Sequence, residues 1–290
     1  MLAEPRKDPQ GAGLDGAALA RTAARLCAAP RAPWLHEEAA RRMAERLPLV
    51  RRQPDLLLDW SGPLGGSAEL LKTAYPKAQR HTIGIADAPV AAPAARAPRR
   101  WPWPARKSGA PLLAEGEVPA GAAQLVWSNM LLQAIADPRP LLARWHEALA
   151  VEGFLMFATL GPGSLPELRA IYRAERWGEP MQAFVDMHDL GDMLVFAGFA
   201  DPVMDQEILT LTWPDVPALL AELRALGANL SPRRHQGLRT PRWRERLQQA
   251  LATTAQDGRP RLSFELVYGH AFKAAPRAPV QLSKRKPDAR

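Results

Sequence analysis

An acidic residue and a cluster of glycines follow the first strongly apolar run of the sequence. From position 55 the chain reads DLLLDWSGPLGGSAELLKTAYP, in which three leucines predict a short buried strand that ends at Asp59. Gly62, Gly65 and Gly66 then form a turn into a helix expected from Ser67 to Ala74. Glycines let a backbone approach a ligand closely, and the acid can organise the turn or bind a ribose hydroxyl. The pattern predicts a nucleotide or nucleoside site, with a tight turn that binds no ligand as the alternative.

A second group of polar residues follows the longer apolar run from Gln124 to Trp127. Ser128 and Asn129 end this run, and a helical stretch then separates it from another apolar run that leads to residues 159–163. Two apolar strands joined by a helix favour a parallel sheet, in which ligands lie beyond the carboxyl ends of the strands. Asn129 can position a substrate or cofactor through its amide, and Gln133, one turn further on, can face the same cleft. The alternative for Ser128 and Asn129 is a structural cap at the strand end, and the alternative for Gln133 is a solvated helix residue.

Three arginines in the loop RRHQGLR form the third candidate group. Arg233, Arg234 and Arg239 can bind an anionic group, such as a carboxylate or the phosphopantetheine of a carrier protein. An ordinary solvated loop is the alternative interpretation. His188, in the sequence DMHD, is expected to belong to a helix-capping cluster with the neighbouring aspartates. No pair of histidines has the spacing of metal ligands, so we expect no metal site.

The elements that must position these residues alternate between strands and helices. Besides the strands above, we expect strands at residues 81–86, 154–159, 200–211 and 261–272 and helices at 14–28, 34–47, 137–152, 165–173, 189–197, 214–226 and 241–253. The helix that begins at Trp34 has an apolar face and should pack against the sheet or cover the site. The order predicts an α/β fold with helices on both faces of the sheet and a last strand that adds in the antiparallel direction.

Composition divides the chain into a central domain and two extensions. We expect an extension at 1–30, largely disordered with one possible helix, a domain at 31–273 and a disordered basic tail at 274–290. Residues 88–122 are rich in Ala, Pro and Arg, contain the sequence WPWP, and are expected to form an irregular exposed insert. Only residues 111–117 of that insert have any strand character.

Charge and cysteine content exclude several functional classes. The 290-residue chain is 47% hydrophobic and has a net charge of +8, but much of that charge lies in the insert and the tail rather than in a nucleic-acid-binding module. No apolar run is long enough to span a membrane, and the single cysteine, Cys27, cannot form an internal disulfide. We therefore expect a cytoplasmic protein that binds neither nucleic acid nor membranes.

With these elements placed, the sequence resembles class I S-adenosylmethionine-dependent methyltransferases, in particular the malonyl-acyl-carrier-protein O-methyltransferases of biotin synthesis. The resemblance covers residues 33–273 and is carried by four motifs: SNMLLQ, FLMFATLGPGSLPELR, FVDMHDLGDMLVFAGFADPVMD and LLAELRALGANLSPRRHQGL. It implies a Rossmann-like sheet of seven strands, S-adenosylmethionine as cofactor and an acyl carrier protein as partner. A related branch contains a mitochondrial complex I assembly factor, so the resemblance alone leaves the activity open.

The resemblance also assigns cofactor-binding roles to particular residues. Asp59 and Gly65 match the family's glycine-rich motif, whereas Ser61 and Pro63 stand where the family usually has glycine. Gly62 and Gly66 can compensate by a shifted turn. The acid that would bind the ribose is Asp87, one residue later than expected, and the acid that would reach the adenine is Glu117.

Two hypotheses from different classes follow. In the first, the protein is a methyltransferase, and no acid or base is assigned because methyl transfer depends mainly on alignment of donor and acceptor. An acidic carrier would dock on a basic surface, and one arginine would pair with the malonyl carboxylate. In the second, the departures in the glycine motif make the protein a non-catalytic scaffold or a module that binds a carrier protein.

Overall fold

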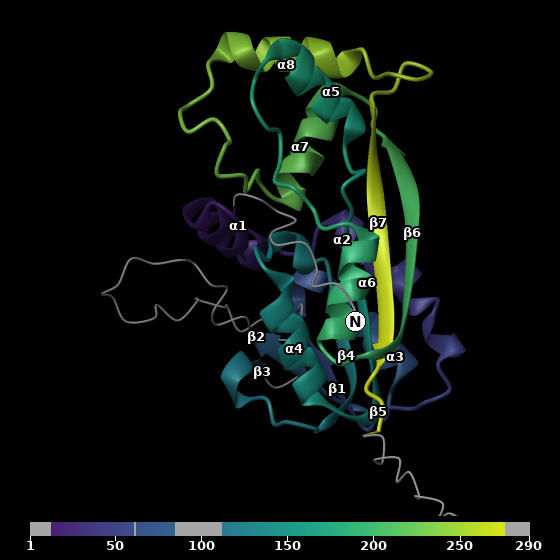
Figure 1. Cartoon of the computed structure of the whole chain (residues 1–290). Helices are drawn as coiled ribbons and strands as arrows, with labels where there is room; N and C mark the ends of the chain where they lie inside the picture. The colour runs from purple at the N-terminus through teal and green to yellow at the C-terminus, as the bar shows by residue number, and fades with distance from the viewer. Residues whose placement is uncertain (1–12, 61, 85–111, 276–290) are drawn as a thin grey trace, which may run out of the picture.

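The computed structural model describes residues 13–60, 62–84 and 112–275, which fold around one seven-stranded sheet (Figure 1). The strands are β1 (Leu56–Asp59), β2 (Gln79–Gly84), β3 (Leu112–Ala114), β4 (Ala123–Asn129), β5 (Leu149–Leu160), β6 (Ala200–Thr212) and β7 (Arg261–Phe272). The α-helices are α1 (Gly16–Ala28), α2 (Trp34–Ala44), α3 (Ala68–Ala74), α4 (Pro138–Ala148), α5 (Pro166–Glu175), α6 (Met187–Phe196), α7 (Val216–Leu226) and α8 (Pro241–Ala252). Four short 3-10 helices are η1 (Leu47–Leu49), η2 (Gly62–Gly65), η3 (Glu115–Glu117) and η4 (Leu132–Ala134).

The strand order is β3-β2-β1-β4-β5-β7-β6, and the first five of these strands are parallel. Because β1 and β4 are neighbours, Asp59 pairs in register with Trp127, two residues before the end of β4. β5 lies on the other side of β4, where Asn129 pairs with Ala158. The carboxyl ends of β1, β4 and β5 therefore meet at one edge of the sheet, as the sequence predicts.

The last two strands run antiparallel and are long. β7 pairs with β5 on one side and with β6 on the other, both in the antiparallel direction. In Figure 1 β6 and β7 run along the full height of the sheet and reach α5, α7 and α8 at its upper end. This arrangement confirms the α/β fold and the antiparallel last strand expected from the sequence.

Alternating side chains of the central strands build a hydrophobic core on each face. Leu57, Leu125 and Trp127 pack on one face under α2, α3, α5, α7 and α8. Leu58 and Val126, one residue out of step, pack on the other face under α4 and α6. A parallel sheet covered on both faces explains why these strands read as continuous apolar runs.

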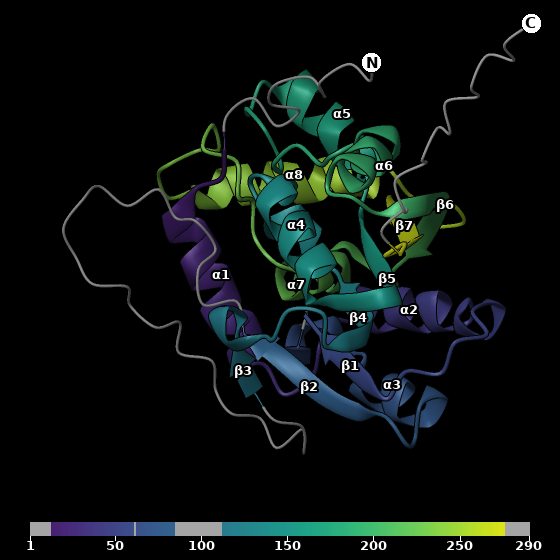
Figure 2. The same ribbon diagram turned by 60° about the horizontal axis from the view of Figure 1, so that its bottom comes forward.

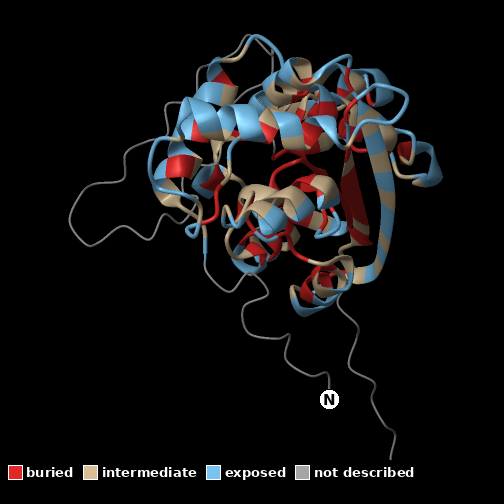
Figure 3. Cartoon of the chain, turned by 90° about the horizontal axis from the view of Figure 1, so that it is seen from above, coloured by how far each residue is buried: buried red, intermediate tan, exposed pale blue. Residues whose placement is uncertain are grey.

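The outer strand β6 has a different pattern. Its residues alternate between intermediate and exposed burial along nearly its whole length, and Figure 3 shows it in tan and blue beside the buried β7. As an edge strand, β6 is covered only in part, which accounts for the alternation already visible in its sequence.

The N-terminal helix α1 is fixed to the loop that follows α7. The Asp15 carboxylate accepts a hydrogen bond from Ala18 N at 2.9 Å and caps α1, while Asp15 N donates to Leu230 O at 2.8 Å. The Arg25 guanidinium donates to Gly227 O at 2.5 Å. Figure 2 shows α1 from below, apart from the strands β1, β4 and β5. The helix predicted at 14–28 is thus an ordered part of the fold.

The insert expected at 88–122 differs from the prediction in its last third. Residues 112–114 form β3, which pairs in parallel with β2, and residues 115–117 form η3. These residues lie within the one stretch of the insert with strand character, and their pairing with β2 supplies the order. Residues 1–12, 85–111 and 276–290, to which parts of the predicted extension, insert and tail belong, lie outside the described residues.

Candidate functional site

The glycine turn, residues 62–66, leaves the end of β1 as a short 3-10 helix rather than as an open loop. The Asp59 side chain, 1% exposed, accepts a hydrogen bond from Gly62 N at 3.1 Å. Gly62 has φ +53° and Gly66 has φ +66°, a region that side chains with a Cβ rarely occupy. The aspartate therefore organises the turn, which is one of the two roles that the sequence allowed for it.

Asn129 connects the turn to helix α2. Its amide nitrogen donates to Gly65 O at 2.5 Å and to His36 O at 2.8 Å, and the side chain is fully buried. A single strand-end amide thus links three segments of the chain that are distant in sequence. This is the structural alternative foreseen for Asn129, since its amide nitrogen bonds two backbone carbonyls.

His36 reinforces the same connection from the other side. Its ring Nδ1 lies 2.8 Å from Leu64 O, an acceptor, so Nδ1 carries the proton and Nε2 keeps a lone pair. Burial lowers the pKa of His36 to about 4, because the charged form loses its hydration. The imidazole is therefore neutral at neutral pH and presents a hydrogen-bond acceptor rather than a charge.

Two further contacts hold the turn against its surroundings. The indole nitrogen of Trp127 donates to the Ser67 hydroxyl at 2.8 Å, at the start of α3. A Cβ placed on Gly66 would stand 3.0 Å from Glu37 Cγ and 3.1 Å from Ala32 Cβ. The close approach at Gly66 is thus made by the first turn of α2 and by the segment that leads into it.

The loop after β5 completes the polar edge. The Gln133 amide accepts from the Thr159 hydroxyl at 3.0 Å and donates to Met130 O at 2.9 Å. Glu265, on β7, accepts a hydrogen bond from Gly163 N at 2.5 Å and so fixes residues 161–164 beside the sheet. Gln133 therefore faces the carboxyl edge of the sheet. This is the first of its two sequence interpretations, the other being a solvated helix residue.

A cavity of about 480 Å³ adjoins this edge, and we call it the inner cavity. His36 and Leu64 of the glycine turn border it, and Gln133 supplies a further polar wall. The rest is mainly apolar and includes Met130, Leu165, Leu168, Met181, Phe184 and Leu223. The inner cavity thus reaches from the carboxyl ends of β4 and β5 to helices α1 and α7.

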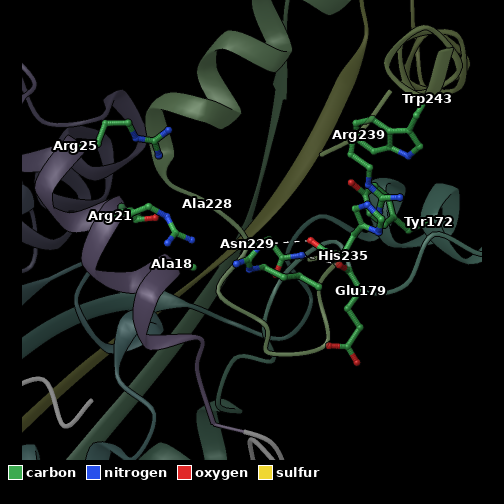
Figure 4. Close-up of a pocket in the computed structure, with 12 residues that line it drawn as sticks. Ala18, Arg21, Arg25, Tyr172, Glu179, Ala228, Asn229, His235, Arg239 and Trp243 are labelled. Carbon is green, nitrogen blue, oxygen red and sulfur yellow. Dashed lines mark hydrogen bonds between the residues drawn. The ribbon is translucent and has the colours of Figure 1, made fainter. Parts of the chain in front are cut away.

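A second cavity of about 380 Å³ adjoins the first, and we call it the mouth. Five residues, Thr22, Arg25, Tyr172, Ala228 and Asn229, line both cavities. Figure 4 shows Arg21 and Arg25 projecting from α1 on one side of the mouth, with Tyr172, Arg239 and Trp243 on the other. The Asn229 amide donates to Glu179 O at 2.6 Å between them.

The three arginines predicted from the RRHQGLR loop have separate environments. Arg233 forms an ion pair with Glu179 at 2.6 Å, and Arg234 forms one with Asp15 at 2.6 Å. Arg239 instead stacks on Trp243, with 4.6 Å between its Cζ and the ring centroid, and donates to Trp177 O at 3.1 Å. Only Arg234 and Arg239 of the three line the mouth.

Comparison with proteins of known name identifies the family of this chain. The chain is 38% identical over 257 residues to a malonyl-acyl-carrier-protein O-methyltransferase of Laribacter hongkongensis, and the match covers 85% of each chain. It is 39% identical over 250 residues to the protein of the same name from Gallionella capsiferriformans, covering 84% of this chain and 85% of the relative. The chain belongs to the malonyl-acyl-carrier-protein O-methyltransferase family. No protein-family model matches the sequence.

A solved structure with a similar fold supports the architecture independently. The YcgJ protein of Bacillus subtilis superposes with a TM-score of 0.52 at 11% identity, over 82% of this chain and 99% of its own. At that identity the likeness concerns the fold alone.

For this family member, the structure brings together one part of the predicted cofactor site. Asp59 and Asn129 each hydrogen-bond the glycine turn. Ser128, the residue before Asn129 in β4, is buried and its hydroxyl has no hydrogen-bond partner among the described residues. Glu117 is exposed and accepts a hydrogen bond from Ala114 N at 2.8 Å. It caps its own turn and borders neither cavity, so the structure does not place it with the others. Asp87 lies outside the described residues.

Several residues of the site were not found from the sequence. His36 was assigned only to a helix that would cover the site, and its ring becomes informative once Leu64 and the inner cavity are located. Arg21 and Arg25 lie four residues apart on α1, a spacing that places them on one helix face, but the helix was read as a peripheral element. Glu265 appeared as one member of an alternating strand.

The remaining sequence predictions concern groups outside the cavities. Asp186 caps α6 by accepting from His188 N at 2.8 Å, and its carboxylate also contacts the His188 ring, which confirms the part of the predicted capping cluster formed by Asp186 and His188. In the described parts of the chain, no group of three His, Cys, Asp or Glu residues is placed to hold a metal ion. Among the described helices, none has the length and apolar character needed to cross a membrane.

Proposed function

We propose that this protein transfers a methyl group from S-adenosylmethionine to the free carboxylate of a malonyl thioester carried by an acyl carrier protein. Membership of the family supports the reaction class. The observation that carries the proposal is the inner cavity, which lies at the carboxyl edge of the parallel strands, next to the glycine turn. In open α/β sheets this edge is where ligands bind.

The described residues fit one end of the cofactor. Leu64, His36 and Gln133 would border its amino-acid portion, and the Nε2 lone pair of His36 matches a group that donates a hydrogen bond. Asp59 would act indirectly, because its carboxylate organises the turn through Gly62 N. The ribose contact through Asp87 remains a prediction.

The chemistry requires little of the protein beyond alignment. When bound, S-adenosylmethionine supplies a methyl group activated by a sulfonium. A carboxylic acid is ionised at neutral pH, so the acceptor oxygen needs no base from the chain. The apolar wall formed by Met130, Met181 and Phe184 would exclude water from the acceptor carboxylate and hold it in place, which raises its reactivity.

The carrier protein as partner rests on the names of the relatives and on the basic mouth. Of the three arginines expected to offer one partner to the malonyl carboxylate, Arg233 and Arg234 pair with Glu179 and Asp15, so Arg239 is the remaining candidate for that prediction. A cytoplasmic location remains part of this proposal, because a chain with the single cysteine Cys27 has no internal disulfide and suits a reducing compartment.

Calorimetric titration with S-adenosylmethionine and S-adenosylhomocysteine tests the cofactor, and transfer of a labelled methyl group to malonyl-loaded carrier protein tests the reaction. We expect binding with a dissociation constant on the order of micromolar, strongly weakened in Asp59→Ala because the turn loses the acceptor for Gly62 N. Asp55→Ala is the matched control, since Asp55 is exposed and precedes the same strand.

The alternative, a non-catalytic scaffold or carrier-binding module, rests on the departures from the family pattern in the cofactor half: Ser61 and Pro63 in the glycine motif, the displaced acid Asp87 and the weakly placed acid Glu117. It predicts no cofactor binding up to millimolar concentrations and no methyl transfer, in a preparation that is folded by circular dichroism. That pair of results would remove the methyltransferase proposal.

A further inference from the structure

The mouth carries cations whose charge is not neutralised within the fold. Arg21 forms no ion pair with any described residue. Arg25 and Arg239 are each held by a backbone carbonyl, Gly227 O at 2.5 Å and Trp177 O at 3.1 Å respectively, rather than by a carboxylate. These contacts fix two guanidinium groups in position while leaving their positive charge available to a ligand.

The acidic residues near the mouth are already engaged. Glu179, the one acid among its described lining residues, pairs with Arg233 and accepts a hydrogen bond from the Ser231 hydroxyl at 2.6 Å. Asp15 pairs with Arg234. The mouth therefore has an excess of positive charge, contributed by Arg21, Arg25 and Arg239, and is suited to an anion.

The connection to the inner cavity defines the shape of the ligand. Thr22 and Tyr172 line both the mouth and the inner cavity. A ligand whose anionic group binds in the mouth can therefore extend past these two hydroxyl groups into the apolar inner cavity. Leu64 of the glycine turn and the neighbouring His36 also line the inner cavity. The basic mouth and the apolar inner cavity together match an elongated molecule with an anionic group at one end and an apolar or weakly polar arm.

We infer that the mouth binds the phosphate of a phosphopantetheine arm, and that the arm enters the inner cavity with its thioester end toward the glycine turn. This inference rests on the proposed function for the identity of the arm. Guanidinium groups bind phosphate oxygens with directed, charge-assisted hydrogen bonds, and several of them suit a tetrahedral anion better than a single lysine would. Arg21 and Arg25 are thus specificity residues for the carrier-bound substrate.

The experiment compares malonyl-phosphopantetheine with malonyl-pantetheine, which has the same arm without the phosphate, by calorimetry in the absence of cofactor. For the unmodified protein we expect the phosphate to tighten binding by about tenfold or more at low salt, and this advantage to shrink as ionic strength rises. In Arg21→Gln the advantage should fall severalfold, while the affinity for malonyl-pantetheine stays unchanged.

Two further variants complete the test. Arg25→Gln should act in the same direction, and Arg244→Gln is the control, because Arg244 is exposed on α8 and borders neither cavity. Equal affinity of the unmodified protein for the two arms would overturn the inference.

This binding experiment separates the inference from the proposed function. If methyl transfer to malonyl carriers occurs but the phosphate adds no affinity, the proposed function stands and the role of the mouth is wrong. If the phosphate adds affinity through Arg21 but no methyl is transferred, the mouth is an arm-binding site in a protein without the proposed reaction.

Discussion

Asn129 and Gly65 are 64 residues apart in sequence, yet the Asn129 amide nitrogen lies 2.5 Å from the Gly65 carbonyl oxygen. The same nitrogen reaches His36 O at 2.8 Å. One side chain therefore holds the glycine turn and the start of α2 at a fixed separation, and these two segments border the inner cavity through Leu64 and His36.

Asn129→Ala should lower the free energy of unfolding by about 2 to 3 kcal/mol, because it removes two hydrogen bonds from buried carbonyl groups. Chemical denaturation measures the change. The neighbouring substitution Ser128→Ala is the control: the Ser128 hydroxyl is buried without a partner among the described residues, so its removal should cost little. Equal losses in the two variants would contradict the structural role of the amide.

Gly66→Ala should destabilise the protein more than Gly121→Ala does. Both glycines have nearly the same positive φ, +66° and +67°, so the conformational cost of alanine is shared, at about 1 kcal/mol. Only at Gly66 would the new Cβ also stand 3.0 Å from Glu37 Cγ, whereas nothing lies within 4 Å at Gly121. Comparing the melting temperatures of the two variants isolates the effect of the contact between the glycine turn and α2. Equal melting temperatures would show that this contact does not restrict position 66.

We expect the free energy of unfolding to fall in mildly acidic solution because of His36. Its pKa is lowered by burial from an ordinary 6.5 to about 4, so protons bind the unfolded chain more tightly than the folded one. The stabilising contribution is complete above about pH 6.5 and is lost as the pH falls toward 4, by about 3 kcal/mol in all.

Urea unfolding measured between pH 7 and pH 4 gives this slope directly. His36→Gln, which cannot be protonated, should flatten it. Burial also lowers the pKa of His146 and His270, so a smaller slope of the same sign should remain in the variant. An unchanged slope would mean that the imidazole of His36 is hydrated in solution.

Glu265→Gln should loosen the loop after β5. The Glu265 carboxylate accepts a hydrogen bond from Gly163 N at 2.5 Å, and loss of its charge weakens a charge-assisted bond, so hydrogen exchange at that amide should accelerate about tenfold. Gly161 N provides an internal control, because it donates to the backbone carbonyl of the same residue at 2.9 Å and should keep its exchange rate. Equal acceleration at both amides would indicate a general disturbance of β7 instead.

Local patterns in the sequence were sufficient for most of the sheet. The buried runs at β1, β4 and β5 and the alternation in β6 follow from which faces are covered, and this depends on side-chain period alone. The strand β3 was visible only as weak strand character at residues 111–117, since a three-residue edge strand is ordered by its pairing with β2 more than by its own composition.

The sequence by itself determined the class of fold and the edge of the sheet at which the site lies, because both depend on the order of strands and helices and on where apolar runs stop. It also identified Asp59, the glycine turn and Asn129 as members of that edge. Only the tertiary structure decided their roles, showing Asp59 and Asn129 bonded to the backbone and Arg233 and Arg234 paired with acids. The grouping of Arg21 and Arg25 with Arg239 likewise depends on contacts between residues more than 200 positions apart, which no local pattern encodes.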